Sequence, residues 1–249
     1  MAWVESNSAS FGARHESDEV DAAAAVLDAL ERFRVRLGAV FERTPAELTL
    51  VLHPRPLMLA LAHPWLPLAW LVASPASRRY FAGWFTTREI HSLSPAALER
   101  RASGVPGSRE ALLLTPQHEY AHVVLSANNP ELPPPFNPRS FARYVRAAWL
   151  CEGAAAYFAG QVPYLRAAIA RRLREGRPPA FPPAPRDAHL LGGTLFTLLE
   201  RERGRDAAAA LSTTFPKLEA REAIEQAFDR PAVAVERDWR DYLASLTSP

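Results

Sequence analysis

Two histidines and a glutamate fall within little more than one helical turn at residues 117–122, which read QHEYAH. Residues four apart lie on the same face of a helix, so His118 and His122 can present both imidazoles to one ion. Neutral imidazole suits zinc, at about 2.0–2.1 Å from nitrogen to metal. Glu119 lies one residue off that axis, where its carboxylate can reach a metal-bound water and take its proton. The spacing therefore indicates a zinc site with a general base beside it.

The motif alone is only suggestive, because a chance H-E-x-x-H match is about a one-in-a-hundred event for this content of His and Glu. A third ligand would strengthen the prediction of a zinc site. A pair of structural histidines is the alternative. A catalytic zinc takes three protein ligands and leaves one position open. Glu152 is the best downstream carboxylate, since the residues around it, WLCEGAAAY at 149–157, are apolar or small and a buried unpaired charge is costly. An ion pair with an arginine such as Arg143 or Arg146 is the alternative for Glu152.

Together these motifs, H-E-x-x-H and W-L-x-E-G-x-A-x-Y, resemble those of the gluzincin metallopeptidases, especially bacterial peptidase-MA-like domains. The resemblance extends over about residues 18–246, but only these two motifs are specific. It implies that His118, His122 and Glu152 hold zinc and that Glu119 is the general base. The gap of 29 residues between His122 and Glu152 is longer than in thermolysin-like enzymes, and the Pro-rich segment 129–137 could account for the difference.

Two positions depart from the family pattern. Thermolysin-like enzymes place an acid four residues after the glutamate ligand to orient a histidine, whereas this chain has Ala156, so such a partner must come from elsewhere. Related domains often carry a tyrosine near the start of the later helix that stabilises the oxyanion, and the comparable residue here is His189. Tyr157 is the other candidate. Simple packing is the alternative for both, and the choice between them stays open.

Other reactive residue types have weaker patterns. Cys151 adjoins the proposed ligand, but we expect a small buried residue rather than a nucleophile. The histidines at 53, 63 and 91 have no ligand spacing, and we expect them to be structural. The resemblance further implies that a strand edge aligns the substrate backbone, and residues 81–85 are the predicted edge.

Composition excludes some partners. A chain of 249 residues with 48% hydrophobic content suits a globular protein of one large domain or two subdomains. Its formal charge is +2 and its arginines are scattered, so we expect no nucleic-acid partner. The single cysteine excludes an internal disulfide framework. Residues 1–19 lack the basic and apolar segments of an export signal, which predicts a cytoplasmic location.

The uncharged run at residues 57–74 is near the lower length limit for a membrane span. His63, Pro64 and Pro67 interrupt it, so we expect no membrane span, and instead a buried helix followed by an apolar loop. A membrane-attached protein is the alternative.

The elements around the motifs predict an α+β, zincin-like fold. It would have a disordered segment at 1–17, a catalytic domain at 18–162 with a small N-terminal sheet and two metal-bearing helices, and a helical C-terminal subdomain at 163–249. Hydrophobic periodicity and turn residues predict the following elements. Strands are expected at 47–53 and as two short strands within 80–93, and helices at 18–43, 94–101, 115–128, 138–160, 163–175, 187–203, 216–229 and 231–246.

The expected function is that of a zinc-dependent metallopeptidase, which hydrolyses peptide bonds of a peptide or protein substrate through a metal-activated water. The alternative is a zinc-bound but inactive domain that binds peptides or a partner protein. The presence of Glu119 favours activity, because an inert scaffold does not need a general base. The open choice of oxyanion donor favours the alternative.

Overall fold

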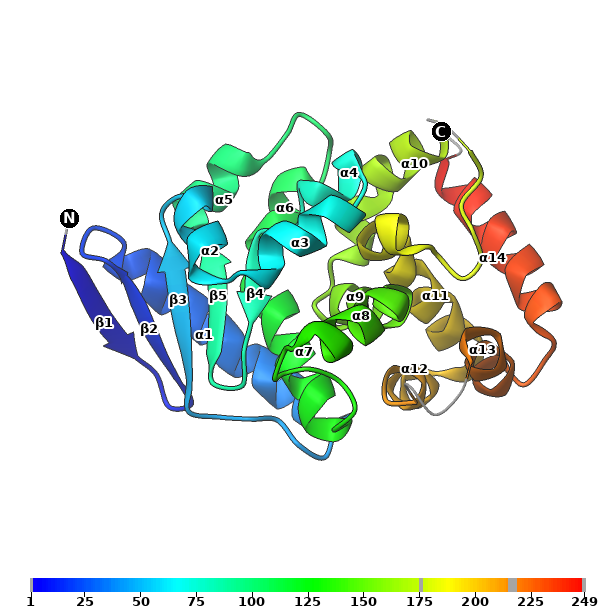
Figure 1. Cartoon of the computed structure of the whole chain (residues 1–249), viewed down its shortest axis with the longest axis horizontal. Helices are drawn as coiled ribbons and strands as arrows, with labels where there is room; N and C mark the ends of the chain where they lie inside the picture. The colour runs from blue at the N-terminus through cyan, green and yellow to red at the C-terminus, as the bar shows by residue number, and fades with distance from the viewer. Residues whose placement is uncertain (1, 175–176, 215–218, 248–249) are drawn as a thin grey trace.

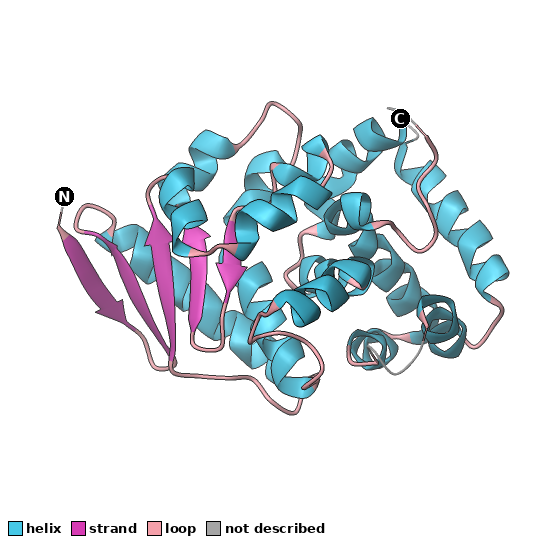
Figure 2. Cartoon of the chain, viewed as in Figure 1, coloured by secondary structure: helices cyan, strands magenta, loops and turns pink. Residues whose placement is uncertain are grey.

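The computed structural model of the chain describes residues 2–174, 177–214 and 219–247. The fold is mixed α+β, as predicted, with a five-stranded sheet toward one end and helices at the other (Figures 1 and 2). The strands are β1 (Trp3–Asn7), β2 (Phe11–Glu16), β3 (Leu48–His53), β4 (Gly83–Phe85) and β5 (Glu89–Leu93). The last three confirm the strands predicted at 47–53 and within 80–93.

The prediction of a disordered segment at 1–17 is wrong, because β1 and β2 form an antiparallel hairpin there. Met1 lies outside the described residues. Phe11, Ala13 and His15 are buried along one side of β2, and the residues between them are more exposed. The ring of Phe11 meets that of Tyr120 edge to face, with centroids 5.2 Å apart. Burial of every second residue is typical of a strand, and one such row of buried side chains is enough to order a segment that is otherwise polar.

The sheet has the order β1-β2-β3-β5-β4. Strands β2, β3 and β5 are parallel, with Leu50 opposite Ile90, while β1 and β4 pair antiparallel at the two edges. One face packs against α1 (Val20–Gly38) and α7 (Thr115–Asn128), where Tyr120 also meets Phe33. The edge strand β4 therefore lies next to the helix that carries the H-E-x-x-H motif.

The opposite face is covered by α2 (Pro56–Ala62), and α3 (Trp65–Val72) and α4 (Pro75–Arg78) continue from it toward the C-terminal helices (Figure 1). The prediction of one buried helix followed by a loop is wrong. The chain forms two helices over 56–72, and α2 buries Leu59 while α3 buries Leu66 and Ala69. Within the described residues, no helix has both the length and the apolar character that crossing a membrane requires.

In the sequence, α5 (Pro95–Arg101) and α6 (Ser108–Leu113) come between β5 and α7. The hydroxyl of Ser94 accepts from the backbone N–H of Ala97, which confirms the predicted cap of the first of these helices. The single helix predicted over 138–160 is wrong, since the chain forms α8 (Pro138–Arg146) and α9 (Ala148–Phe158) with a break at Ala147.

The C-terminal part is helical, as predicted, and it includes a helix at 205–212 that the pattern did not indicate. Its elements are η1 (Val162–Leu165), α10 (Arg166–Arg174), η2 (Pro185–Asp187), α11 (Ala188–Arg203), α12 (Arg205–Ser212), α13 (Ala220–Phe228) and α14 (Ala232–Thr247), where η marks a 3₁₀ helix. Residues 216–218 of the predicted helix 216–229 lie outside the described residues. The boundary at residues 162 and 163 between two subdomains stays a prediction.

Helices α9 and α11 are in backbone contact. A Cβ added to Gly153 would lie 2.5 Å from the carbonyl carbon of Gly192, a distance that real Cβ atoms do not reach. Small residues let two helix backbones approach this closely. On α14, the fully buried Trp239 donates its indole N–H to the hydroxyl of Thr194 at 2.8 Å, which ties that helix to α11.

Candidate metal centre

Helix α7 holds its two histidines deep in the protein. Pro116 occupies the first turn, where a missing N–H costs no hydrogen bond, and the N–H of His118 bonds to the carbonyl of Leu114. Every residue from 115 to 125 is buried. Because residues four apart share a face, His118 and His122 point together toward α9.

The imidazoles meet the carboxylate of Glu152 from α9. The two Nε2 atoms are 3.1 Å apart, Nε2 of His118 lies 3.4 Å from Oε2 of Glu152, and Nε2 of His122 lies 3.6 Å from Oε1. Ligands about 2.0–2.1 Å from a tetrahedral zinc ion lie roughly 3.3–3.4 Å from one another. The three predicted ligands therefore already have the spacing that one small cation requires.

The alternative of an ion pair between Glu152 and an arginine does not hold. Arg143 reaches the carboxylate of Glu131 at 3.0 Å, and Arg146 is exposed on α8. Burial raises the pKa of a carboxyl group, but hydrogen bonds from His118 and His189 outweigh it and hold the pKa of Glu152 well below its usual range. The charge partners of Glu152 are thus histidines, as expected at a metal centre.

Gln161 orients His118, a role that the sequence did not reveal. Nδ1 of His118 donates to the side-chain carbonyl oxygen of Gln161 at 2.8 Å, and the Gln161 amide donates to the backbone carbonyl of Ala111 at 2.8 Å. In the neutral ring, a proton on Nδ1 leaves on Nε2, which faces the cluster, the lone pair that a metal ion requires. This contact supplies the partner that Ala156 cannot provide.

Glu119 lies against the edge strand. A Cβ added to Gly83 of β4 would lie 2.6 Å from Cγ of Glu119 and 2.7 Å from its Oε1, so the glycine leaves the space that this carboxylate fills. Burial raises the pKa of Glu119 to about 8, His118 opposes the rise, and Glu152 adds to it. A divalent cation beside these groups would favour the ionised carboxylates.

The histidine pKa values differ within the cluster. Burial lowers the pKa of His122 to about 3, with Glu152 opposing the change. Burial acts on His118 in the same direction, but the neighbouring carboxylates of Glu152 and Glu119 outweigh it and raise its pKa. Neutral His122 has a free lone pair for a metal ion.

Of the two candidate oxyanion donors, the structure brings only His189 to the cluster. Its Nδ1 lies 3.0 Å from Oε2 of Glu152, and its donor atoms, with those of His118 and Glu152, lie within 4.8 Å of one another. Its Nε2 is buried without a hydrogen-bond partner among the described residues. Tyr157 lies outside the cavity, where its ring stacks on Phe196 with centroids 5.8 Å apart.

Tyr144 of α8 is a site residue that the sequence analysis missed. Its hydroxyl donates to Oε1 of Glu152, and its ring centroid lies 5.9 Å from that of His122. In one continuous helix, residues eight apart would be about 12 Å from each other along the axis. The break between the helices at Ala147 brings Tyr144 and Glu152 together. In the sequence, the one indication of this residue is a tyrosine within a predicted helical segment that is otherwise rich in arginine.

The cluster faces a narrow cavity. About 10 Å³ is open to the centre of a water-sized sphere, which is room for one small ion or one water. Phe85 of β4 stacks on His122 with centroids 4.6 Å apart, and Phe136, which precedes α8, contacts Phe85 in turn. The lining combines the cluster residues with an aromatic wall, namely Tyr80, Phe81, Gly83, Trp84, Phe85, His118, Glu119, His122, Tyr144, Glu152 and His189.

The remaining histidine and cysteine candidates lie away from the cavity. Nε2 of His53 and Nδ1 of His91 are 3.0 Å apart, and the ring of His63 is 6.1 Å from that of His91, on the sheet face that α2 covers. Cys151 is buried, as predicted, and burial raises the pKa of its thiol. Residues 81–85, the predicted substrate edge, include β4, which is the last strand of the sheet.

No protein-family model, curated protein or solved structure matches the chain. The geometry of this cluster is therefore the main evidence that bears on function.

Proposed function

We propose that the chain is a zinc-dependent peptidase of the gluzincin type with a zincin-like fold. The observation that carries the proposal is the spacing of the donor atoms of His118, His122 and Glu152, which lie 3.1–3.6 Å from their neighbours. Gln161 orients one of these ligands, and Glu119 lies beside them against β4. The arrangement supports three protein ligands with a general base next to the remaining position.

The residues of the chain would divide the chemistry among them. A bound Zn²⁺ supplies a Lewis acid and lowers the pKa of water. Glu119 would take the proton of the attacking water and pass it to the nitrogen of the departing amine. The free edge of β4 would hold the substrate backbone by strand pairing, because β4 is the last strand of the sheet.

Tyr144 is a better oxyanion donor than His189. Because Nδ1 of His189 donates to Glu152, the neutral ring has no proton on Nε2 to give. The hydroxyl of Tyr144 carries a proton and already points into the cluster toward Oε1 of Glu152. It could turn from this carboxylate to a developing oxyanion within the same cavity.

Substrate entry requires the cavity wall to move, because about 10 Å³ cannot admit a peptide. Phe136 packs behind this wall, with its ring centroid 4.9 Å from that of Trp84, 5.3 Å from that of Phe85 and 5.7 Å from that of Tyr144, so its displacement would free three lining residues to move. It lies at the end of the Pro-rich segment 129–137. Movement of such a segment on substrate binding is common in enzymes with closed sites.

The second candidate is a zinc-bound domain without hydrolytic activity. The small cavity favours it, and so does His189, which completes a second triangle of donors with His118 and Glu152. Four protein ligands and no open position are typical of structural zinc sites. The two candidates share a metal and differ in whether a position is left for water.

Metal analysis of the purified protein is the first test, and about one zinc per chain is expected. His122→Ala should lose the zinc, whereas His91→Ala, a buried histidine outside the cluster, should keep it. Equal zinc content in the two variants would overturn the assignment of the ligands.

Hydrolysis of a peptide library separates the two candidates. Glu119→Gln should retain zinc and cleave about 10²-fold or more slowly than the wild type, because it removes the general base. Equal cleavage by wild type and variant would reject Glu119 as the base. A zinc-loaded wild type that cleaves nothing would favour the inactive domain.

A further inference from the structure

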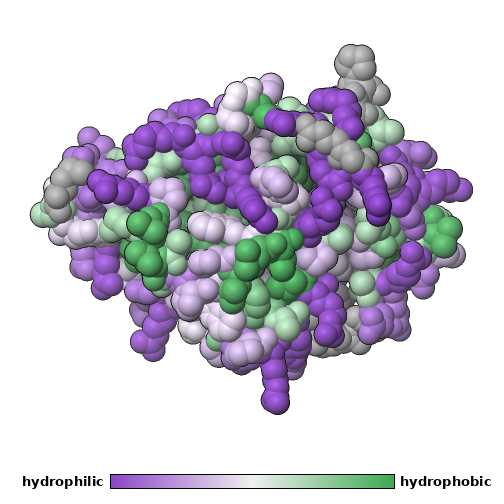
Figure 3. Space-filling model, turned by 45° about the horizontal axis from the view of Figure 1, so that its top comes forward, coloured by the Kyte–Doolittle hydropathy of each residue, from purple (hydrophilic) through white to green (hydrophobic). Residues whose placement is uncertain are grey.

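An apolar surface lies on α2 and α3. Six large hydrophobic side chains are exposed there within 16 residues, and they are Leu57, Met58, Leu61, Leu68, Leu71 and Val72. The described residues elsewhere contain five exposed side chains of this kind. Figure 3 shows the surface as green patches on the face that carries these two helices. Single exposed apolar residues are ordinary, but a cluster of this kind marks an interaction site.

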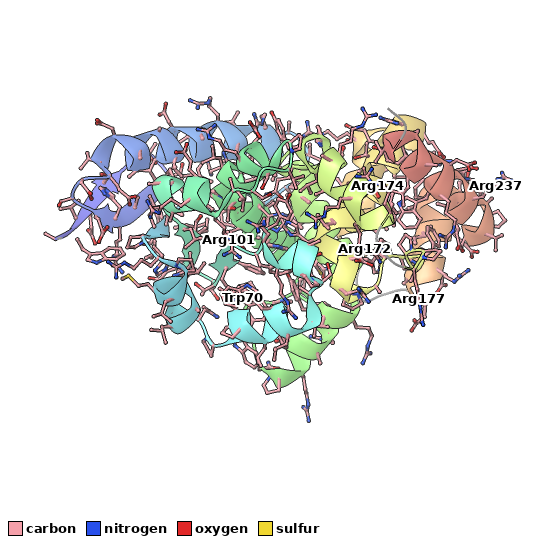
Figure 4. All side chains as sticks on the ribbon, turned by 90° about the horizontal axis from the view of Figure 1, so that it is seen from above. Trp70, Arg101, Arg172, Arg174, Arg177 and Arg237 are labelled. Atoms are coloured by element: carbon pink, nitrogen blue, oxygen red, sulfur yellow. The ribbon has the colours of Figure 1, made fainter. Side chains whose placement is uncertain are left out.

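Arginines flank this apolar surface and form its basic rim. Residues 48–88 contain four arginines and no aspartate or glutamate. Arg55 precedes α2, and Arg78 and Arg79 follow α3, all three exposed. Arg101 at the end of α5 donates to the backbone carbonyls of both Arg78 and Arg79, which holds this end of the segment against α5. Figure 4, seen from above, labels Arg101 and Trp70 of α3, and α2 and α3 lie along its lower edge.

We propose that the outer face of α2 and α3 docks onto the surface of a membrane that contains anionic lipids. Exposed leucines would enter the boundary between head groups and acyl chains, and the arginine rim would meet the lipid phosphates. Helices of seven and eight residues are about 12 Å long or less, whereas the hydrocarbon core is about 30 Å thick. The helices therefore lie in the interface and do not span the bilayer.

The charge pattern favours a lipid surface over a second copy of the chain. Two copies joined through this face would bring their arginine rims together, because residues 48–88 carry no acidic side chain to pair with them. Like charges facing each other across an interface oppose association. An anionic bilayer complements both the apolar centre and the basic rim.

The docking face is the outer side of a segment whose inner side borders the candidate metal centre. Trp65 of α3 stacks on Phe141 of α8 with centroids 5.0 Å apart, and His63 contacts Trp84 at 5.3 Å. Trp84 lines the cavity. Docking would therefore hold the cavity wall close to the lipid head groups.

The test measures binding of the full chain to vesicles by co-sedimentation. Vesicles of phosphatidylcholine with phosphatidylglycerol should bind the wild type at least about tenfold more strongly than vesicles of phosphatidylcholine alone, and salt should weaken the binding. Leu61→Gln with Leu71→Gln should lower binding to the anionic vesicles at least about tenfold. These side chains are 76% and 73% exposed, so the variant should fold, and its circular dichroism should match that of the wild type.

The matched control is Val35→Gln with Val233→Gln. These side chains are 71% and 70% exposed on α1 and α14, and their replacement should leave vesicle binding unchanged. Equal loss in the two double variants, or no preference for anionic vesicles, would overturn the proposal. So would a wild type that binds no vesicles, or one that dimerises through Leu61 and Leu71 without binding them.

Vesicle binding requires neither zinc nor Glu119, so the result is independent of the proposed peptidase activity. The measurement on Glu119→Gln should equal that on the wild type.

Discussion

The contact between α9 and α11 leads to a sharp prediction for Gly153→Ala. The new Cβ would lie 2.5 Å from the carbonyl carbon of Gly192 and 2.8 Å from its Cα and oxygen, while ordinary contact begins at 3.4 Å. All three atoms belong to the backbone and cannot rotate away. The helices would have to separate by about 0.9 Å, a shift of the size that a packed core resists.

The expected cost follows from two opposing terms. Overpacking a core costs about 1–3 kcal/mol, and backbone contact on one side places this substitution at the upper end. Replacing glycine by alanine inside a helix stabilises the helix by about 1 kcal/mol. The net loss in the free energy of unfolding is therefore about 2 kcal/mol. Because Glu152 precedes Gly153, the shift would also lengthen the 3.0 Å contact between Glu152 and His189 and lower zinc affinity about tenfold.

Urea denaturation and a competitive zinc titration measure the two effects. Gly104→Ala is the matched control, since a Cβ at Gly104 meets no atom within 4 Å. The control should leave zinc affinity unchanged and leave stability equal or higher by up to about 1 kcal/mol. If Gly153→Ala matches the control in both measurements, the two helices are not in backbone contact and the prediction is wrong.

Three further predictions concern buried polar groups. Gln161→Leu removes the acceptor that orients His118, so zinc affinity should fall about 10- to 100-fold in the same titration, and an unchanged affinity would deny Gln161 that role. Tyr144→Phe removes the hydroxyl that donates to Glu152 and should lower kcat on a peptide substrate more than it lowers zinc affinity. A larger fall in zinc affinity than in kcat would mean that the hydroxyl only positions the ligand Glu152. Burial lowers the pKa of His53 from 6.5 to about 4, so the unfolded chain takes up a proton below pH 6.5 that the folded chain refuses. The stability present above pH 6.5 should thus decline as the pH falls toward 4, by at most about 3 kcal/mol and by less where solvent screens the charge. Between pH 7 and pH 5, the urea midpoint of His53→Gln should therefore fall less than that of the wild type. An equal fall would remove His53 as a source of the acid sensitivity.

The sequence sufficed for the parts of the site that follow from local rules. The i, i+4 spacing of His118 and His122 determines their common helix face, whatever surrounds it. Glu152 could be inferred because a carboxylate within an apolar stretch requires a partner, and its neighbours in the fold are histidines. Gln161 and Tyr144 could not be predicted in the same way. The contact of Tyr144 depends on the interruption between α8 and α9 at Ala147, and that of Gln161 on the turn after α9, and no local pattern indicates either feature.

The errors in the fold have two physical causes. The strand β1 buries no residue fully, so its segment has the composition of a disordered tail although backbone pairing with β2 orders it. The prediction of burial for the run at 57–74 rests on its apolar composition, yet two short helices at the surface cannot bury every side. Apolar content alone does not determine burial. By contrast, Ser94 and Pro95 act through local hydrogen bonding and backbone geometry, and the helix they predict is present.

The small volume of the cavity also bears on how an ion would leave the protein. With room for about one water, the cavity is too small to hold a chelator from solution. Release would wait for the wall around Phe136 to part, so its rate should level off at the frequency of that opening as the chelator concentration rises. The rate of metal loss at high chelator concentration would then measure how often the wall around Phe136 opens in the absence of substrate.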